Sequence, residues 1–146
     1  MKALVQRVLW AKVEVGGDTV SSIGPGLLVF LGVAADDGPR EADYLAARVA
    51  ALRVFEDREG RMNLSLRDTG GEALVVSQFT LVADTARGNR PGFSGAAPPQ
   101  EAEGIYQRFL ESLKGEGIKT GSGVFRAQMT VSLANDGPVT IMLESK

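Results

Sequence analysis

The residues best suited to binding or catalysis in this sequence are four consecutive ones, Ser77-Gln78-Phe79-Thr80. They follow the apolar run 73–76, where hydroxyl and amide groups are costly unless each finds a hydrogen-bond partner. At the end of a buried strand they could face a cleft, with their backbone N–H groups directed at a ligand carbonyl. The alternative interpretation is an ordinary strand end whose polar groups are satisfied by a neighbouring turn.

Two further segments carry candidate residues. The loop 87–95 combines Arg87 and Arg90 with Phe93; a guanidinium matches phosphate geometry, and an aromatic ring can stack on a base. A solvated surface loop is the alternative there, although long irregular segments in compact domains are more often functional or disordered. Gly137-Pro138 is expected at a hairpin turn, because proline cannot donate a hydrogen bond to a β-ladder.

The absence of two residue types limits the chemistry. The 146 residues include no histidine and no cysteine. This excludes thiol nucleophiles, disulfides, zinc ribbons, the Ser-His-Asp triad and almost every catalytic zinc or haem site. No phosphate-binding glycine loop, dinucleotide fingerprint, metal-ligand cluster or nucleophile elbow is found either. An enzyme with this sequence has to use hydroxyls, carboxylates, amides, Lys and Arg side chains, or backbone groups.

Charge and hydropathy limit the class of protein further. Sixteen Lys and Arg against 18 Asp and Glu give a net charge of −2, whereas a protein that coats DNA is strongly basic. A small basic patch that grips one end of a nucleic acid stays compatible with this charge. No apolar run approaches the ~18 residues of a membrane span. The charged start does not resemble a signal peptide, so a cytoplasmic location is expected.

These candidate residues have to be positioned by a fold in which strands outnumber helices. Alternation over 8–15 and a β-rich run over 19–23, around Gly16-Gly17, predict a hairpin. The continuous apolar run 27–33 predicts a strand covered on both faces. The run 73–82 predicts a second buried strand with a polar break.

Two helices and three short strands complete the prediction. Asp36–Pro39 has the composition of a helix start, and apolar residues follow at helical spacing from Ala42 to Phe55. Pro98-Pro99 opens the second helix, which is expected to stop near Gly115 or Gly117. The short strands are predicted at 62–66, 129–133 and 139–143, with a turn over 135–138 between the last two. The result is one α/β domain over residues 1–146, in the order β-β-β-α-β-β-α-β-β.

Several segments together resemble the D-aminoacyl-tRNA deacylase family: Gln6-Arg7-Val8, Ser77–Leu81, Arg90–Phe93 and Asn135–Thr140. The resemblance runs from residue 1 to about residue 144, with the same order of elements and a similar length. The family's loop motif commonly reads Arg-Pro-Ser-Phe. Here Gly92 replaces the serine, so no hydroxyl is available at that position.

The resemblance implies mixed β-sheets packed with a helical layer, in a cytoplasmic, homodimeric hydrolase without metal or organic cofactor. It implies cleavage of the ester between a D-amino acid and the 3′-terminal adenosine of tRNA. Ser77 to Thr80 would form the pocket floor, and a cis Gly137-Pro138 would reach into the partner protomer's site. Phe125 and Met129 would flank the adenine, and Arg7 would hold the Gly-Pro loop.

The expected mechanism needs no histidine. An aminoacyl ester is already activated, so a placed water, an oxyanion site and orientation suffice. Backbone N–H groups around Gln78 and Phe79 are the expected oxyanion donors, and the substrate's ribose 2′-OH is expected to assist the water. The competing hypothesis makes Thr80 a nucleophile, but a threonine hydroxyl needs a neighbouring base. Arg87 and Arg90 are expected to contact tRNA phosphates.

Rejection of L-aminoacyl-tRNA is expected from groups pressed against the substrate's Cα, which leave room for hydrogen alone. Glycyl-tRNA, which has no side chain to reject, is then also a substrate. One alternative is a related editing deacylase that acts on tRNA mischarged with glycine or L-alanine and has a trans Gly137-Pro138. A non-catalytic module that binds the tRNA end, or a pocket protein that sequesters a ligand, are the others.

Overall fold

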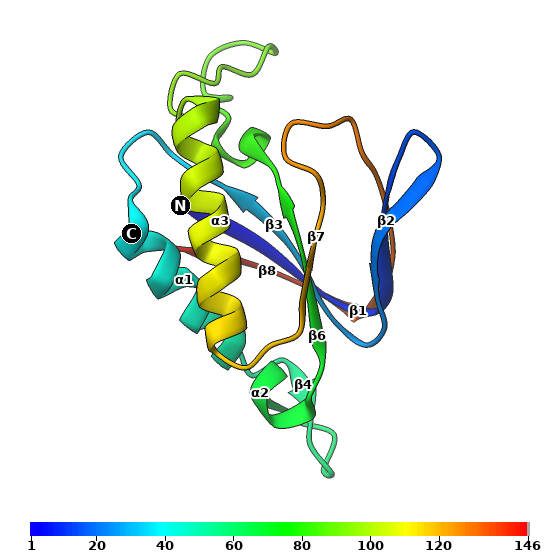
Figure 1. Ribbon diagram of the computed structural model, residues 1–146. Helices are drawn as coiled ribbons and strands as arrows, with labels where there is room; N and C mark the ends of the chain where they lie inside the picture. The colour runs from blue at the N-terminus through cyan, green and yellow to red at the C-terminus, as the bar shows by residue number, and fades with distance from the viewer. Residues whose placement is uncertain (146) are drawn as a thin grey trace.

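The strand that organises the fold is the first one, β1 (Lys2–Val15), which pairs with β2, β3 and β8. The computed structural model describes residues 1–145. Its main sheet has six strands: β2-β1-β3-β6-β7 in order, with β8 also paired to β1 (Figure 1). The elements after β1 are β2 (Asp18–Ile23), β3 (Gly26–Gly32), α1 (Pro39–Ala51), β4 (Phe55–Glu56), β5 (Met62–Leu64), α2 (Leu66–Thr69), β6 (Glu72–Ser77), the 3-10 helix η1 (Phe79–Val82), α3 (Pro99–Gly115), β7 (Thr120–Ser122) and β8 (Thr130–Glu144).

β1 changes partners along its length, and the sheet turns where it does so. Residues 2–8 pair with β3, and residues 11–15 pair with β2. β8 runs antiparallel along both halves of β1. The second half of β1 thereby packs over one face of β3 and β6. The predicted hairpin around Gly16-Gly17 is confirmed, although β1 extends further toward the N-terminus than the predicted 8–15.

The apolar strand β3 is buried on both faces because its side chains alternate between two cores. Leu27, Val29 and Leu31 belong to the core beneath α1 and α3. Leu28 belongs to the second core, together with the far half of β1, β2, β6 and the start of β8. Full burial of one such side chain stabilises the fold by ~1.5–3 kcal/mol. The predicted strand covered on both faces is therefore confirmed.

The helical layer consists of α1 and α3, which lie side by side against one face of the sheet (Figure 1). Arg108 of α3 donates two hydrogen bonds to Asp43 of α1, at 2.7 and 2.8 Å, and Ser112 donates a third. These bonds, Arg108 first, lower the pKa of Asp43 to about 2. Both predicted helices are confirmed, and no helix within residues 1–145 is long and apolar enough to span a membrane.

Three local predictions are wrong. The predicted strand 73–82 ends at Ser77, and the chain turns into η1. The first helix ends at Ala51, so Phe55 lies in β4 instead of on the helical face. Leu66 begins α2 instead of ending a strand, because the Ser65 side chain accepts a hydrogen bond from the Asp68 amide and caps a helical turn.

The predicted hairpin turn over 135–138 is also wrong: it is a bulge in one continuous strand. Residues 130–135 and 140–144 both pair antiparallel with β1. Gln6 pairs with Thr140 and Val8 with Asn135, so four residues of β8 stand opposite Arg7 alone. An inserted segment of this kind redirects side chains without ending the strand. With these corrections, the predicted mixed α/β fold is confirmed.

Candidate active site

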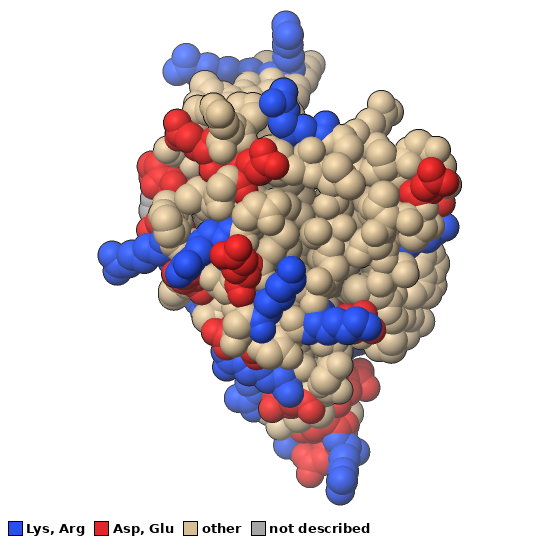
Figure 2. Space-filling model, in the orientation of Figure 1, with Lys and Arg blue, Asp and Glu red and all other residues tan. Residues whose placement is uncertain are grey.

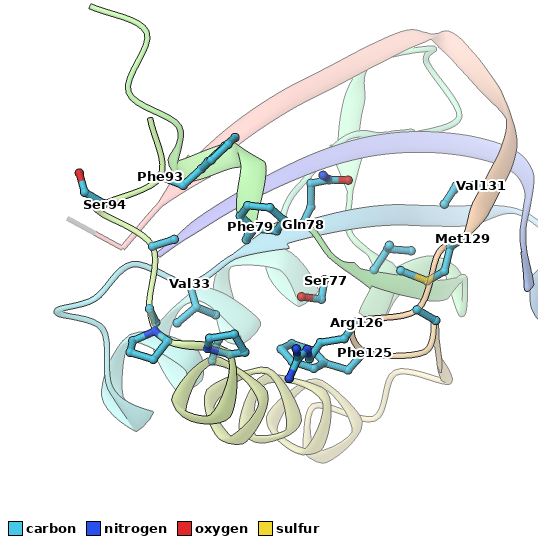
Figure 3. A pocket seen from close by; sticks show the side chains of 17 residues that line it. Val33, Ser77, Gln78, Phe79, Phe93, Ser94, Phe125, Arg126, Met129 and Val131 are labelled. Carbon is cyan, nitrogen blue, oxygen red and sulfur yellow. The ribbon is translucent and has the colours of Figure 1, made fainter. Parts of the chain in front are cut away.

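A cavity of about 770 Å³ opens at the end of β6. It lies between η1, the segment before α3, the first turns of α3 and the segment that leads into β8 (Figure 3). Its lining is mostly apolar, with few polar side chains, which is the usual character of a small-molecule pocket. The lining residues are Val33, Val76, Ser77, Gln78, Phe79, Phe93, Ser94, Ala96, Ala97, Pro98, Pro99, Ala102, Phe125, Arg126, Ala127, Met129 and Val131.

The backbone directly after β6 leaves hydrogen-bond donors unpaired next to this cavity. The amide of Gln78 is occupied, because it donates to the Leu31 carbonyl at 2.8 Å. η1 starts directly afterwards, and the first amides of a helix have no partner inside that helix. Within residues 1–145 the amides of Phe79 and Thr80 have no acceptor. The free donors are thus those of Phe79 and Thr80, one residue later than the expected pair.

The hydroxyl of Thr80 has no base beside it. Its side chain is exposed and does not line the cavity. It accepts a hydrogen bond from the Gln78 side-chain amide, which is not a base. No carboxylate or amine of residues 1–145 is hydrogen-bonded to it. Since a threonine nucleophile needs a neighbouring base, this geometry does not favour the Thr80 nucleophile.

Aromatic side chains form two opposite walls. Phe79 and Phe93 meet edge to face, with ring centroids 5.0 Å apart, and close the side nearest the loop 84–98. Phe125 forms the other side, where its ring centroid lies 5.7 Å from that of Tyr106. Burial raises the pKa of Tyr106 to about 12, and its hydroxyl donates to the Val75 carbonyl at 2.9 Å. Tyr106 therefore acts as a fixed support beneath Phe125.

Gly137 and Pro138 form the exposed crest of the β8 bulge and are joined by a cis peptide bond. Arg7, which is 5% exposed, supports the bulge from below. Its guanidinium donates to the carbonyl of Asp136 at 3.2 Å and to that of Val54 at 2.6 Å. Neither Gly137 nor Pro138 lines the cavity of its own chain.

Arg87 and Arg90 lie on an exposed loop beyond Phe93. Two backbone hydrogen bonds of 2.8 Å between Asp84 and Gly92 close the base of this loop. In Figure 1 the loop projects from the top of the molecule, and Figure 2 shows basic side chains at that end. Both arginines are therefore outside the cavity.

Comparison with known proteins decides the family. The family model described as D-Tyr-tRNA(Tyr) deacylase matches residues 4–144. The chain belongs to the D-aminoacyl-tRNA deacylase family. A D-aminoacyl-tRNA deacylase of Thermodesulfovibrio yellowstonii is 53% identical over 146 residues, 100% of both chains. One of Cereibacter sphaeroides is 57% identical over 145 residues, 99% of this chain and 100% of the relative. The predicted family and the prediction of a deacylase enzyme are confirmed.

Solved structures agree on the deacylase fold. The structure named c-Myc DNA Unwinding Element Binding Protein has a TM-score of 0.94 and 45% identity, and the match covers 100% of this chain and 99% of that one. A probable eukaryotic D-amino acid tRNA deacylase has a TM-score of 0.84 and 16% identity, over 98% of each chain. At that identity the second structure supports the fold alone.

The structure brings together only part of the residue set that the deacylase resemblance predicted. Ser77, Gln78, Phe79, Phe125 and Met129 line the cavity. The predicted residues that lie outside it are Thr80, Gly137, Pro138, Arg7, Arg87 and Arg90. Sequence reasoning missed Arg126, which lines the cavity beside Phe125 (Figure 3). No motif marks this arginine, because its place depends on the conformation of the turn that carries it.

Proposed function

We propose that this protein hydrolyses the ester of D-aminoacyl-tRNA and releases the free D-amino acid and tRNA. The observation that carries the proposal is the pair of free backbone amides, Phe79 and Thr80, at the lip of a cavity in a chain of this family. Donors of this kind stabilise the oxyanion of an ester under attack without any titratable side chain. Such a site works without the histidine and cysteine that this chain lacks.

In the proposed reaction the terminal adenosine enters between Phe125 and Met129, and the ester carbonyl oxygen accepts hydrogen bonds from the amides of Phe79 and Thr80. Water attacks the carbonyl carbon, and the bond from that carbon to the ribose oxygen breaks. The water oxygen stays on the amino acid, and a proton passes to the ribose oxygen. The neighbouring ribose hydroxyl orients the water, so orientation and the backbone donors supply the catalysis.

We propose that the working unit is a dimer in which Gly137-Pro138 of one copy enters the cavity of the other. Two features support this. The crest of the bulge is exposed and takes no part in its own cavity. The bulge is nevertheless supported by the buried Arg7, which donates to the Asp136 carbonyl within the bulge and is itself anchored by the Val54 carbonyl outside it. In a symmetric pair each bulge would complete the other copy's site.

Selectivity for the D configuration follows from the same contact between the Gly137-Pro138 bulge and the substrate. A rigid bulge pressed against the substrate's Cα leaves space for hydrogen on one side only, so an L side chain clashes. Glycine has no side chain to clash, and glycyl-tRNA is therefore expected to react. The work would take place in the cytoplasm, with Arg87 and Arg90 as local contacts for tRNA phosphates. Because the chain has a net charge of −2, it would bind the tRNA phosphates only through such a small basic region.

The experiment is hydrolysis of D-tyrosyl-tRNA, L-tyrosyl-tRNA, glycyl-tRNA and L-alanyl-tRNA by the wild-type protein, with release of labelled amino acid as the readout. The proposal expects release from the D-tyrosyl and glycyl substrates and none from the two L substrates. Release from L-alanyl-tRNA would instead support an editing deacylase of the other specificity. Binding of tRNA without release of any amino acid would indicate a non-catalytic module and overturn the proposal.

A further inference from the structure

One charged side chain lines the cavity, and it is basic. Among the lining residues, all within residues 1–145, Arg126 is the only Asp, Glu, Lys or Arg. The chain as a whole carries a net charge of −2, so the cavity differs in sign from the rest of the molecule. Next to mostly apolar walls, a single charge is the main electrostatic feature that a bound ion would meet.

The backbone that presents Arg126 has an unusual conformation. The Ala127 amide donates to the Val124 carbonyl at 3.2 Å and closes a turn with Arg126 at its third position. Arg126 has φ 64°, the only positive φ of a residue other than glycine in the described chain. Turns of this kind favour glycine or asparagine at that position. The left-handed conformation is unfavourable for a residue with a Cβ atom, so another contribution has to favour the arginine side chain.

The folded chain itself does not provide that contribution. Arg126 is exposed, and within residues 1–145 its guanidinium makes no hydrogen bond or ion pair. Figure 3 shows the Arg126 and Phe125 side chains together, on the other side of the cavity from Phe93. Five N–H donors in a planar fork are therefore available next to the ring expected to hold the adenine.

We propose that Arg126 binds the phosphate on the 5′ side of the substrate's terminal nucleoside. This inference rests on the proposed function, which puts that nucleoside beside Phe125 and Met129. The terminal nucleoside is itself uncharged, and the first charge along the RNA is the phosphate that joins it to the preceding nucleotide. A guanidinium beside the nucleoside pocket pairs with this phosphate through two parallel hydrogen bonds. Through this contact, Arg126 would favour hydrolysis of an ester attached to RNA over the same ester on a free nucleoside.

The test compares two substrates with the same ester. One is D-tyrosyl-tRNA, and the other is D-tyrosyl-adenosine, which carries no phosphate. The variants are Arg126→Gln, Arg126→Gly and Arg126→Lys, with Arg58→Gln as the matched control. Arg58 is exposed in the turn between β4 and β5, where no ion pair or hydrogen bond of its side chain is found within residues 1–145. Arg126→Gly also removes the backbone strain, so it is expected to fold at least as well as the wild type.

For Arg126→Gln and Arg126→Gly we expect kcat/KM on D-tyrosyl-tRNA to fall about 10-fold, mainly through KM, which is typical of one charge-assisted contact. The slope of log(kcat/KM) against log salt is expected to become shallower by about 0.7, the value for one phosphate contact on a single strand. Activity on D-tyrosyl-adenosine stays unchanged. Arg126→Lys keeps the charge but not the two parallel hydrogen bonds, so it retains the salt slope and a larger part of the tRNA activity than Arg126→Gln. Arg58→Gln behaves as the wild type.

Equal losses on both substrates, or no loss on either, would overturn the proposal. D-aspartyl-adenosine forms a further arm, since the guanidinium could instead pair with a carboxylate of the amino acid; a loss confined to that substrate also overturns it. If the wild type hydrolyses neither D-tyrosyl substrate, the proposed function fails by itself. The Kd of uncharged tRNA then decides on Arg126, because an unchanged Kd in Arg126→Gln contradicts phosphate binding.

Discussion

Gly137→Ala should damage activity much more than a single methyl group suggests. A Cβ atom on Gly137 would lie 2.9 Å from Nη2 of Arg7 and 2.9 Å from Cγ2 of Val139. Both distances are shorter than real Cβ contacts, so a neighbour has to move. Arg7 cannot move freely, because Val54 and Asp136 hold its guanidinium. The φ of Gly137 is also 122°, where an L side chain is strained.

The expected cost in unfolding free energy is about 1–3 kcal/mol, the range for a residue forced into a sparsely populated backbone region. Since most of this strain acts at the bulge, the variant stays folded but its crest is displaced. We expect kcat/KM on D-tyrosyl-tRNA to fall at least ~100-fold, as for other misplacements of about 1 Å at a reacting centre. L-tyrosyl-tRNA is expected to stay unreacted.

Denaturant unfolding and a deacylation assay on the same preparation measure both effects. Gly104→Ala is the matched control, because Gly104 lies in α3 with nothing within 4 Å of an added Cβ. This control should stabilise the helix by ~0.5–1 kcal/mol and keep full activity. Unchanged stability and activity in Gly137→Ala would refute the reasoning that the Arg7-supported bulge is part of the site.

The remaining predictions concern the Thr80 hydroxyl, the backbone donors that follow β6, and the contact between α1 and α3. Thr80→Ala should retain most of the deacylase activity; a loss near 10⁴-fold, as for a true nucleophile, would contradict the mechanism. Phe79→Pro, which removes a backbone donor at a helix start where proline is tolerated, should lower kcat ~10²–10³-fold, beyond any effect of the control Phe79→Ala. Asp43→Asn should cost about 1 kcal/mol of unfolding free energy at pH 7, since a side chain 42% exposed is partly screened. The difference from wild type should shrink as the pH falls from 3.8 toward about 2, because the lowered pKa of Asp43 stabilises the fold only while the carboxyl is ionised.

Much of the fold could be predicted from periodicity, because the buried elements are long. The continuous apolar run 27–33 predicted a strand covered on both faces, and Pro98-Pro99 marks the start of α3. Periodicity failed where a tertiary contact overrode it. Leu81 and Val82 have the composition of a strand, but they belong to η1. Residues 135–138 have the composition of a hairpin turn, yet both flanks pair with β1.

The site could be predicted only as far as the resemblance reached. Ser77-Gln78-Phe79 was a candidate from its residue types, since polar groups at the end of a buried apolar strand need hydrogen-bond partners. Phe125 and Met129 carried no such signal, and only the fold explains their place opposite β6. The occupied amide of Gln78 depends on the carbonyl of Leu31 in a neighbouring strand. No reading of the local sequence could have shown that the free donors are one residue further on.

The central claim is deacylation at a site completed by a second copy of the chain, and mixed dimers test it most directly. The Phe79→Pro variant lacks a backbone donor next to its own cavity. The Gly137→Ala variant has a displaced bulge, which affects the cavity of its partner. Alone, each should be nearly inactive. When the two variants are co-expressed, half of the dimers are mixed, and each mixed dimer has one intact site out of two. The account therefore predicts recovery of about a quarter of wild-type D-tyrosyl-tRNA hydrolysis. No recovery beyond the two separate variants would contradict it.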